Sequence, residues 1–328
     1  ENDLGRYGLG LKMASMSQCR ILTVISKQNG ETNGCQWNLD YIANESKDWS
    51  LILLDEETLE QFPNYEKIKN AEHGTLIIWQ NLDRLAVGES QIEKVFRDKM
   101  AIIREHLSLV FHRYISGETG LIKLNIRMND RSIEPIDPFL TKKSTQLMDE
   151  EIIVVRGKKV KVKPFILPHT SKLTKAELIQ LGGKDGLRKL QGFYVYRNKR
   201  LLIWGTWFRL MRQGDLTKLS RVQVDIPNSL DDLWTLDIKK STATPPEEVR
   251  NNLKTIIGKI AEGSRRTWTF RGKKEISDKM VHVWNRKITR DGNVFYEVNN
   301  EHPMVVDFIN RYPQSEKYLT NILKQIAL

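Results

Sequence analysis

Many short strand patterns and two long helical patterns alternate along this chain, and that mixture constrains its fold most. Residues 90–114 carry apolar side chains at helical spacing without Pro or Gly, and Pro245-Pro246-Glu247 opens a helix expected to end near Ala261. Shorter helices are predicted at 11–16, within 56–69 and at 173–181. Strands are predicted at 19–26, 37–42, 50–54, 75–79, 121–126, 152–155, 160–166, twice within 192–203, at 221–226 and at 233–238. The sequence therefore predicts an α+β chain.

The composition limits the class of protein. The 328 residues correspond to about two domains, and the net charge of +11 favours polyanionic partners. Two cysteines exclude a disulfide framework or a four-cysteine zinc site, and the six histidines form no metal-binding motif, so no metal ligand is predicted among them. No apolar run reaches the ~18 residues of a membrane span. We expect a soluble, cytoplasmic protein without membrane contact.

A glycine-rich loop near the start of the chain has a chemical use. Glycines let a backbone approach a phosphate and direct successive N–H groups at it, and a following helix adds its positive end. Lys12 would add a charge. The loop lacks the Gly-Lys-Ser/Thr ending of a P-loop, and no strand precedes it as in a dinucleotide fingerprint. The predicted phosphate-binding residues are Gly5, Arg6, Tyr7, Gly8, Leu9, Gly10 and Lys12.

This loop, with the helix and hairpin after it, resembles the second glycine box of the GHKL ATPases, which include gyrase B, the large heat-shock chaperone, histidine kinases, MutL and MORC proteins. The residues of this motif are most similar to those of MORC-type and prokaryotic members. Further along, His73-Gly74-Thr75 and the strand after it resemble the third box, in which the Thr lies near the adenine. The resemblance implies ATP and Mg²⁺ as cofactors and assigns Thr75 to the nucleotide site.

The resemblance extends into the second half of the chain. Relatives follow the ATPase domain with a right-handed βαβ transducer domain, which donates a lysine to the γ-phosphate. Lys240, or alternatively Lys239, stands after a predicted strand at the expected place. The implied organisation is the C-terminal part of a Bergerat-type α/β sandwich ATPase domain at 1–115, a transducer at 116–262 and a small basic region at 263–328.

The resemblance also implies how such a protein works. The family's catalytic Glu, its magnesium-binding Asn and its adenine-reading Asp all lie upstream of the second glycine box, and this chain has no residue before Glu1. We therefore expect ATPase activity in the full-length protein and little or none in this piece alone. In relatives, ATP drives homodimerisation into a clamp. MORC and MutL make DNA the expected substrate, and prokaryotic relatives suggest antiviral defence or DNA processing with partner proteins of the same system.

The basic C-terminal region supports a nucleic-acid partner. Positions 251–290 contain eleven Lys and Arg but only three Asp and Glu, so this segment contributes +8 to the net charge of +11. Basic side chains contact phosphates and aromatic rings stack on bases. The predicted nucleic-acid residues are Arg265, Arg266, Trp268, Arg271, Lys273 and Lys274. An ordinary small domain with a basic surface is the competing interpretation.

Two other functions fit the same sequence. One is a chaperone-like ATPase that acts on protein clients. The other is a non-enzymatic nucleic-acid-binding module, in which the glycine loop is only a turn. Replacing Gly8 and Gly10 by bulky residues discriminates between them, because only an ATPase would lose nucleotide binding.

Overall fold

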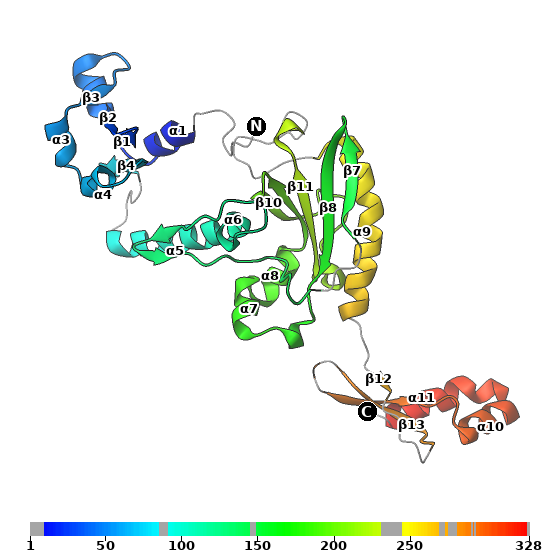
Figure 1. Cartoon of the computed structure of the whole chain (residues 1–328). Coiled ribbons are helices and arrows are strands. Elements are labelled where there is room, and N and C mark those ends of the chain that lie inside the picture. Colours follow the sequence, from blue (N-terminus) through cyan, green and yellow to red (C-terminus); the bar gives the residue numbers. More distant parts are fainter. Residues whose placement is uncertain are drawn as a thin grey trace. The chain divides into compact units, whose positions relative to one another are not determined.

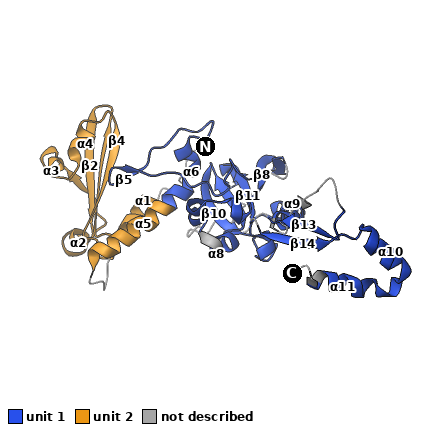
Figure 2. Ribbon diagram, turned by 90° about the horizontal axis from the view of Figure 1, so that it is seen from below, with its two compact units in different colours: residues 1–2, 106–328 blue, residues 3–105 orange. Residues whose placement is uncertain are grey.

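The computed structural model describes residues 10–84, 91–144, 149–230, 245–268, 273–274, 281–289, 291 and 293–326. It contains both helices and sheets, so the α+β prediction is confirmed (Figure 1). The chain divides into two compact units, one of residues 3–105 and one made mainly of residues 106–328 (Figure 2). The predicted division at 1–115, 116–262 and 263–328 stays a prediction.

The first unit contains a four-stranded antiparallel sheet with the order β3-β2-β1-β4. Its strands are β1 (Ile21–Gln28), β2 (Glu31–Asn38), β3 (Ile52–Leu54) and β4 (Gly74–Gln80). Its helical segments are α1 (Gly10–Met16), α2 (Leu39–Tyr41), the π-helix η1 (Ile42–Ser46), α3 (Glu56–Glu60), α4 (Tyr65–Lys69) and the first part of α5 (Ile92–Val110). The hairpin expected after the first helix forms with its turn at Asn29-Gly30, where both residues have positive φ between paired strands.

The two faces of this sheet are covered differently. On one face, Ile25 packs with Leu59 of α3 and with Tyr65 and Ile68 of α4 in a buried cluster. On the opposite face α1 lies against β1. Because side chains alternate along each strand, one face of the sheet packs in the buried cluster and the other face contacts α1.

One predicted strand of this unit is wrong in its bounds. Residues 37–42 were expected to form the returning strand, but β2 ends at Asn38 and the chain turns into α2. The Asn38 side chain accepts hydrogen bonds from the backbone N–H groups of Asp40 and Tyr41. An N-cap therefore overrides the strand propensity of the following residues.

The second unit contains a five-stranded sheet with the order β10-β9-β11-β8-β7. Its strands are β7 (Glu151–Val155), β8 (Lys158–Ile166), β9 (Gly192–Arg197), β10 (Arg200–Thr206) and β11 (Ser220–Ile226). β9 and β11 are parallel, and the chain between them contains β10 and the 3-10 helix η3 (Asp215–Thr217). Among the described residues this sheet therefore has no helical crossover of the predicted βαβ kind, because a hairpin strand occupies the connection.

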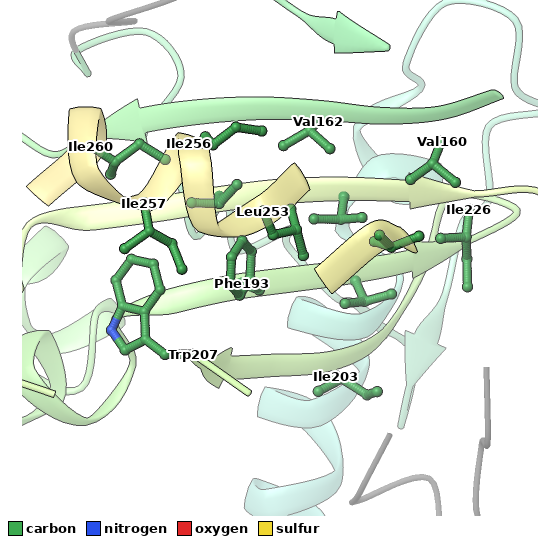
Figure 3. Packing of buried hydrophobic residues seen from close by; sticks show 14 of the residues in the cluster. Val160, Val162, Phe193, Ile203, Trp207, Ile226, Leu253, Ile256, Ile257 and Ile260 are labelled. Carbon is green, nitrogen blue, oxygen red and sulfur yellow. The ribbon is translucent and has the colours of Figure 1, made fainter. Parts of the chain in front are cut away.

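The core of the second unit lies between this sheet and α9 (Glu247–Trp268) (Figure 3). Val160 and Val162 of β8 and Phe193 of β9 contribute to the same buried cluster as Leu253 and Ile260 of α9. The start of α9 agrees with the sequence, but the helix continues past the predicted end near Ala261. Ser264 is fully buried, so the buried face of α9 extends beyond the predicted end of the helix.

The opposite face of the five-stranded sheet is covered at one end. Phe139 forms a buried cluster there with Phe165, Tyr194, Tyr196 and Leu201, against which Leu109 of α5 packs. The predicted strand at 121–126 is wrong, because that segment pairs with no strand among the described residues. The other elements before β11 are α6 (His112–Ser116), β5 (Arg127–Met128), β6 (Arg131–Ser132), the 3-10 helix η2 (Thr170–Lys172), α7 (Lys175–Gln180) and α8 (Gly183–Lys189).

The C-terminal segment forms a small group of strands and helices. It contains the 3-10 helix η5 (Pro313–Ser315), the strands β12 (Lys273–Lys274), β13 (Trp284–Ile288) and β14 (Val294–Val298), and the helices α10 (Pro303–Arg311) and α11 (Glu316–Ile326). The 3-10 helix η4 (Asn228–Leu230) follows β11 instead, and its Leu230 belongs to the buried cluster between the five-stranded sheet and α9. The Trp284 indole N–H donates to the Leu323 carbonyl at 3.3 Å, which ties β13 to α11. Throughout the described chain, no helix combines the length and apolar character needed to cross a bilayer.

Candidate functional site

Thr75, which the sequence assigns to a ligand site, lines a cavity of about 610 Å³. The cavity lies where the β1–β2 hairpin turns beside the start of β4. Ser26 and Thr75 are opposite each other in the ladder, and their hydroxyl oxygens are 3.4 Å apart. The full lining is Ser26, Lys27, Gln28, Asn29, Gly30, Glu72, His73, Gly74 and Thr75. Most of these groups donate or accept hydrogen bonds, so the cavity suits a polar ligand.

The hairpin side of this cavity is fixed by one contact from β1. The Lys27 ammonium donates to the Lys69 carbonyl at 2.6 Å, at the end of α4. This bond ties the strand next to the turn to the helix layer of the same unit. Since Lys27 is engaged there, its position in the cavity wall is held by the fold.

The face of β4 that carries Thr75 also carries an anchor for α1. Thr75, Ile77 and Trp79 alternate onto one face of the strand, and Ile77 is 45% exposed. The Trp79 indole N–H donates to the Ser15 hydroxyl at 2.9 Å. Ser15 is fully buried, and its carbonyl accepts from the Cys19 thiol at 3.2 Å. The helix that follows the glycine loop thus lies on the face that presents the Thr75 hydroxyl beside an apolar side chain.

Lys12 of α1 lies next to two aromatic rings. Its ammonium is 4.7 Å from the centre of the Trp37 ring and 5.0 Å from that of Trp49. Both distances are within the range of a cation–π interaction. In this structure Lys12 therefore fastens α1 to the strand β2 and to the segment after η1, and its assignment to a phosphate stays a prediction.

The remaining predicted nucleotide-site residues divide into two groups. Gly10 begins α1, and a Cβ atom there would meet no other atom within 4 Å. The described structure thus brings Gly10, Lys12 and Thr75 into one unit. The predictions that lie outside the described residues are Gly5, Arg6, Tyr7, Gly8, Leu9, Lys239 and Lys240.

The predicted nucleic-acid residues are distributed over two elements. Arg265 and Arg266 lie exposed in the last turn of α9, and Arg266 pairs with Glu262 at 3.1 Å. Trp268 ends that helix, and Lys273 and Lys274 form β12. Arg271 lies outside the described residues.

The described residues form no cluster of metal ligands of their own. In the ranges that the structure describes, no group of three or more His, Cys, Asp or Glu side chains converges as metal ligands do. The oxygen donors that Mg²⁺ prefers would have to come from a ligand, from solvent or from other residues. We therefore assign no step to the ion.

Sequence reasoning named Thr75, which lies in the cavity wall, but did not name the groups around it. Ser26, Lys27 and Asn29 belong to a hairpin that the sequence predicts, but only the pairing of β1 with β4 brings them beside Thr75. The Trp79–Ser15 bond was missed for the same reason. A period of two along 75–79 does place Thr75 and Trp79 on one face, and that signal was available.

Comparisons with known proteins identify the family of the first segment. No curated protein matches the chain. Among the solved structures that match is the 43K ATPase domain of Thermus thermophilus gyrase B in complex with an aminocoumarin, which is similar over 80% of this chain and 70% of that chain, with 13% identity and a TM-score of 0.32. That score is below the level of a shared fold, so the assignment stands on the sequence match. Residues 1–75 match the family of histidine kinase-, DNA gyrase B- and HSP90-like ATPases, which confirms the resemblance to the GHKL superfamily.

Proposed function

We propose that this chain belongs to an ATP-binding and ATP-hydrolysing protein of MORC-like type. It would act in the cytoplasm as a nucleotide-gated homodimeric clamp on DNA, in defence or DNA processing with partner proteins of its own system. The observation that supports nucleotide binding is that the segment matched by the ATPase family contains a cavity with Thr75 in its wall. The net charge of +11 supports a DNA partner.

The proposed nucleotide site uses two kinds of group. The Thr75 hydroxyl would bind the polar edge of the adenine while Ile77, on the same face of β4, contacts the ring. The residues from Gly5 to Gly10 would bind the phosphates through backbone N–H groups. Lys240, or Lys239, would contact the γ-phosphate from a transducer domain at 116–262, and ATP would be bound with Mg²⁺.

Nucleotide binding is tested with two variants of the full-length protein. Thr75→Val removes the hydroxyl at nearly constant volume, and Gly8→Leu together with Gly10→Leu blocks the backbone of the loop. Each should weaken the binding of a fluorescent ATP analogue, Thr75→Val by about tenfold, which corresponds to one lost hydrogen bond of ~1.4 kcal/mol. Thr32→Val, at the start of β2 and outside the cavity wall, is the matched control. Unchanged affinity in both test variants would favour a non-enzymatic module.

Hydrolysis is tested on the present chain. We propose that it hydrolyses ATP poorly or not at all, because the family resemblance implies that the catalytic Glu lies upstream of the second glycine box. A steady-state assay should give a turnover far below that of the full-length protein. Equal turnover would contradict the proposal and place the base within residues 1–328.

The DNA part of the proposal is tested on the basic C-terminal region. Neutralising Arg265, Arg266, Lys273 and Lys274 together should weaken DNA binding and reduce its dependence on salt. If DNA binding persists unchanged, either protein clients or another surface of the chain must be considered.

A further inference from the structure

β8 carries a row of lysines on the face of the sheet that lies opposite α9. Val160 and Val162 are fully buried against α9, so the alternation of the strand directs Lys159, Lys161 and Lys163 to the other face. Alternate residues of a strand are about 7 Å apart. We refer to these three side chains as the lysine row, and Figure 1 shows β8 between β7 and β11 with α9 alongside.

The charges of the lysine row are largely available. Lys159 is exposed and Lys163 is half-buried, and among the described residues neither has a carboxylate partner. Lys163 lies over the Phe165 ring at 5.6 Å. Lys161 pairs with Glu150 at 2.8 Å, but both side chains are well exposed, and such a pair contributes at most about 1 kcal/mol. An incoming anion can therefore displace Glu150 at little cost.

The surroundings determine how a ligand would approach. The buried aromatic cluster around Phe139 covers the far end of this face, whereas Ile152 and Val154 of β7 are 51% and 63% exposed beside the lysine row. Asp225 of β11 is opposite Lys161 in the ladder, but it is engaged by Arg113 and Lys199. The open part of the face is therefore basic along β8 and aliphatic along β7.

We propose that the lysine row binds the phosphodiester backbone of nucleic acid. Three cations at regular spacing along a straight strand match a polyanion whose charges repeat along a line. No described arginine or asparagine stands in the row, so contacts of this kind would position DNA without reading its sequence. This deepens the DNA part of the proposed function and is independent of nucleotide binding.

An acidic peptide fits this surface less well. An extended peptide would add to the edge of the sheet at β7, where backbone groups are unpaired among the described strands. The lysine row lies on the next strand of the sheet, about 4.8 Å from β7. A peptide paired with the edge of β7 would therefore not lie over the lysine side chains. A ligand that covers two strands and presents phosphates toward the sheet uses the row directly.

The experiment measures binding of a 30-base-pair duplex to the full chain by fluorescence anisotropy at several salt concentrations. The test variant carries Lys159→Gln, Lys161→Gln and Lys163→Gln. The control carries Lys67→Gln, Lys94→Gln and Lys172→Gln, which removes the same charge from exposed lysines on α4, α5 and η2. The test variant should bind roughly tenfold or more weakly at 0.1 M salt, and its slope of log K against log salt should fall by two to three, since each phosphate contact contributes about 0.9.

Two further variants keep the test decisive. Replacing the three lysines by arginine should preserve binding, which shows that the positive charge at these positions is what DNA requires. Glu150→Gln should strengthen binding several-fold, because it releases Lys161. The proposal is overturned if the wild type does not bind DNA at low salt, if test and control variants lose binding equally, or if the test variant loses affinity for poly-glutamate but not for DNA. The Thr75→Val measurement separates any of these results from a failure of nucleotide binding.

Discussion

The Arg113 guanidinium donates to the Asp225 carboxylate at 2.6 Å and so joins α6 to β11 across 112 residues of sequence. The two side chains are 6% and 12% exposed. Glu118 also accepts from Arg113, and Lys199 contacts Asp225 at 3.2 Å. Burial opposes the charge of Arg113, but the hydrogen bonds and charges of Glu118 and Asp225 outweigh it and raise the pKa of Arg113.

Asp225→Asn should destabilise this unit by about 3 kcal/mol, at the lower end of the effect of breaking a buried ion pair, because Glu118 still neutralises Arg113. Urea denaturation followed by tryptophan fluorescence measures the change. Asp215→Asn is the matched control, since Asp215 is 68% exposed and its contact with Lys218 is 3.9 Å long. A loss below about 1 kcal/mol in Asp225→Asn would show that the pair adds little to stability.

His112 should make the stability of the same region depend on pH. Burial lowers the pKa of His112 to about 4, against 6.5 for the free side chain. Between pH 6.5 and 4 the unfolded chain therefore binds more protons than the folded chain. As a result, the free energy of unfolding is highest above pH 6.5 and decreases as the pH drops toward 4. His112→Gln keeps a hydrogen-bonding group near the Tyr196 hydroxyl, which lies 2.8 Å from the ring nitrogen. In this variant the loss between pH 7 and 5 should shrink by roughly 2 kcal/mol. Identical pH profiles for both proteins would contradict the assignment.

The bond between Trp79 and Ser15 should hold α1 on the first sheet. Trp79→Phe keeps an aromatic ring but leaves the buried Ser15 hydroxyl without its donor, which should cost about 1–2 kcal/mol. Hydrogen exchange of the α1 amides should become faster at the same time. Trp49→Phe is the comparison, because Trp49 is 58% exposed and a phenyl ring still accepts the Lys12 cation. If both variants exchange alike, the bond does not anchor the helix.

Two glycines of the second unit should respond to alanine in opposite directions. Gly192 has φ +114°, and a Cβ there would lie 2.5 Å from the Thr206 carbonyl oxygen, so Gly192→Ala should cost about 3 kcal/mol or more. Gly258 lies within α9, where a Cβ meets nothing within 4 Å, so Gly258→Ala should stabilise by about 0.5–1 kcal/mol. Thermal denaturation of both variants measures this, and a stable Gly192→Ala protein would mean that β9 and β10 pair differently.

Sequence patterns predicted the fold well where the deciding contacts are local. The hairpins at Asn29-Gly30, Gly157 and Asn198-Lys199 combine alternating strands with residues that tolerate positive φ, and all three form. The run 121–126 has similar apolar content but no partner strand among the described residues, and its Ile122 is 84% exposed. A strand forms there only if another strand pairs with it, and a local sequence pattern does not show whether such a partner exists.

The ends of helices and the candidate site show the same limit. Gly263 and Ser264 resemble a helix stop, yet α9 continues because Ser264 packs against the rest of its unit. The motif around Thr75 identified one residue of the cavity, whereas Ser26 joined it only through the register of β1 on β4. Side chains that meet through strand pairing need the topology before they can be named.

The place of β11 in its sheet has a consequence for how the protein matures. β11 is the last of the five strands to be synthesised, yet it stands third, between β9 and β8. A nascent chain that ends before Ser220 holds two separate hairpins with no strand to join them, and their apolar faces stay open to water. Assembly of this sheet must therefore wait until Ile226 has left the ribosome, and any truncation before that residue should yield an insoluble product.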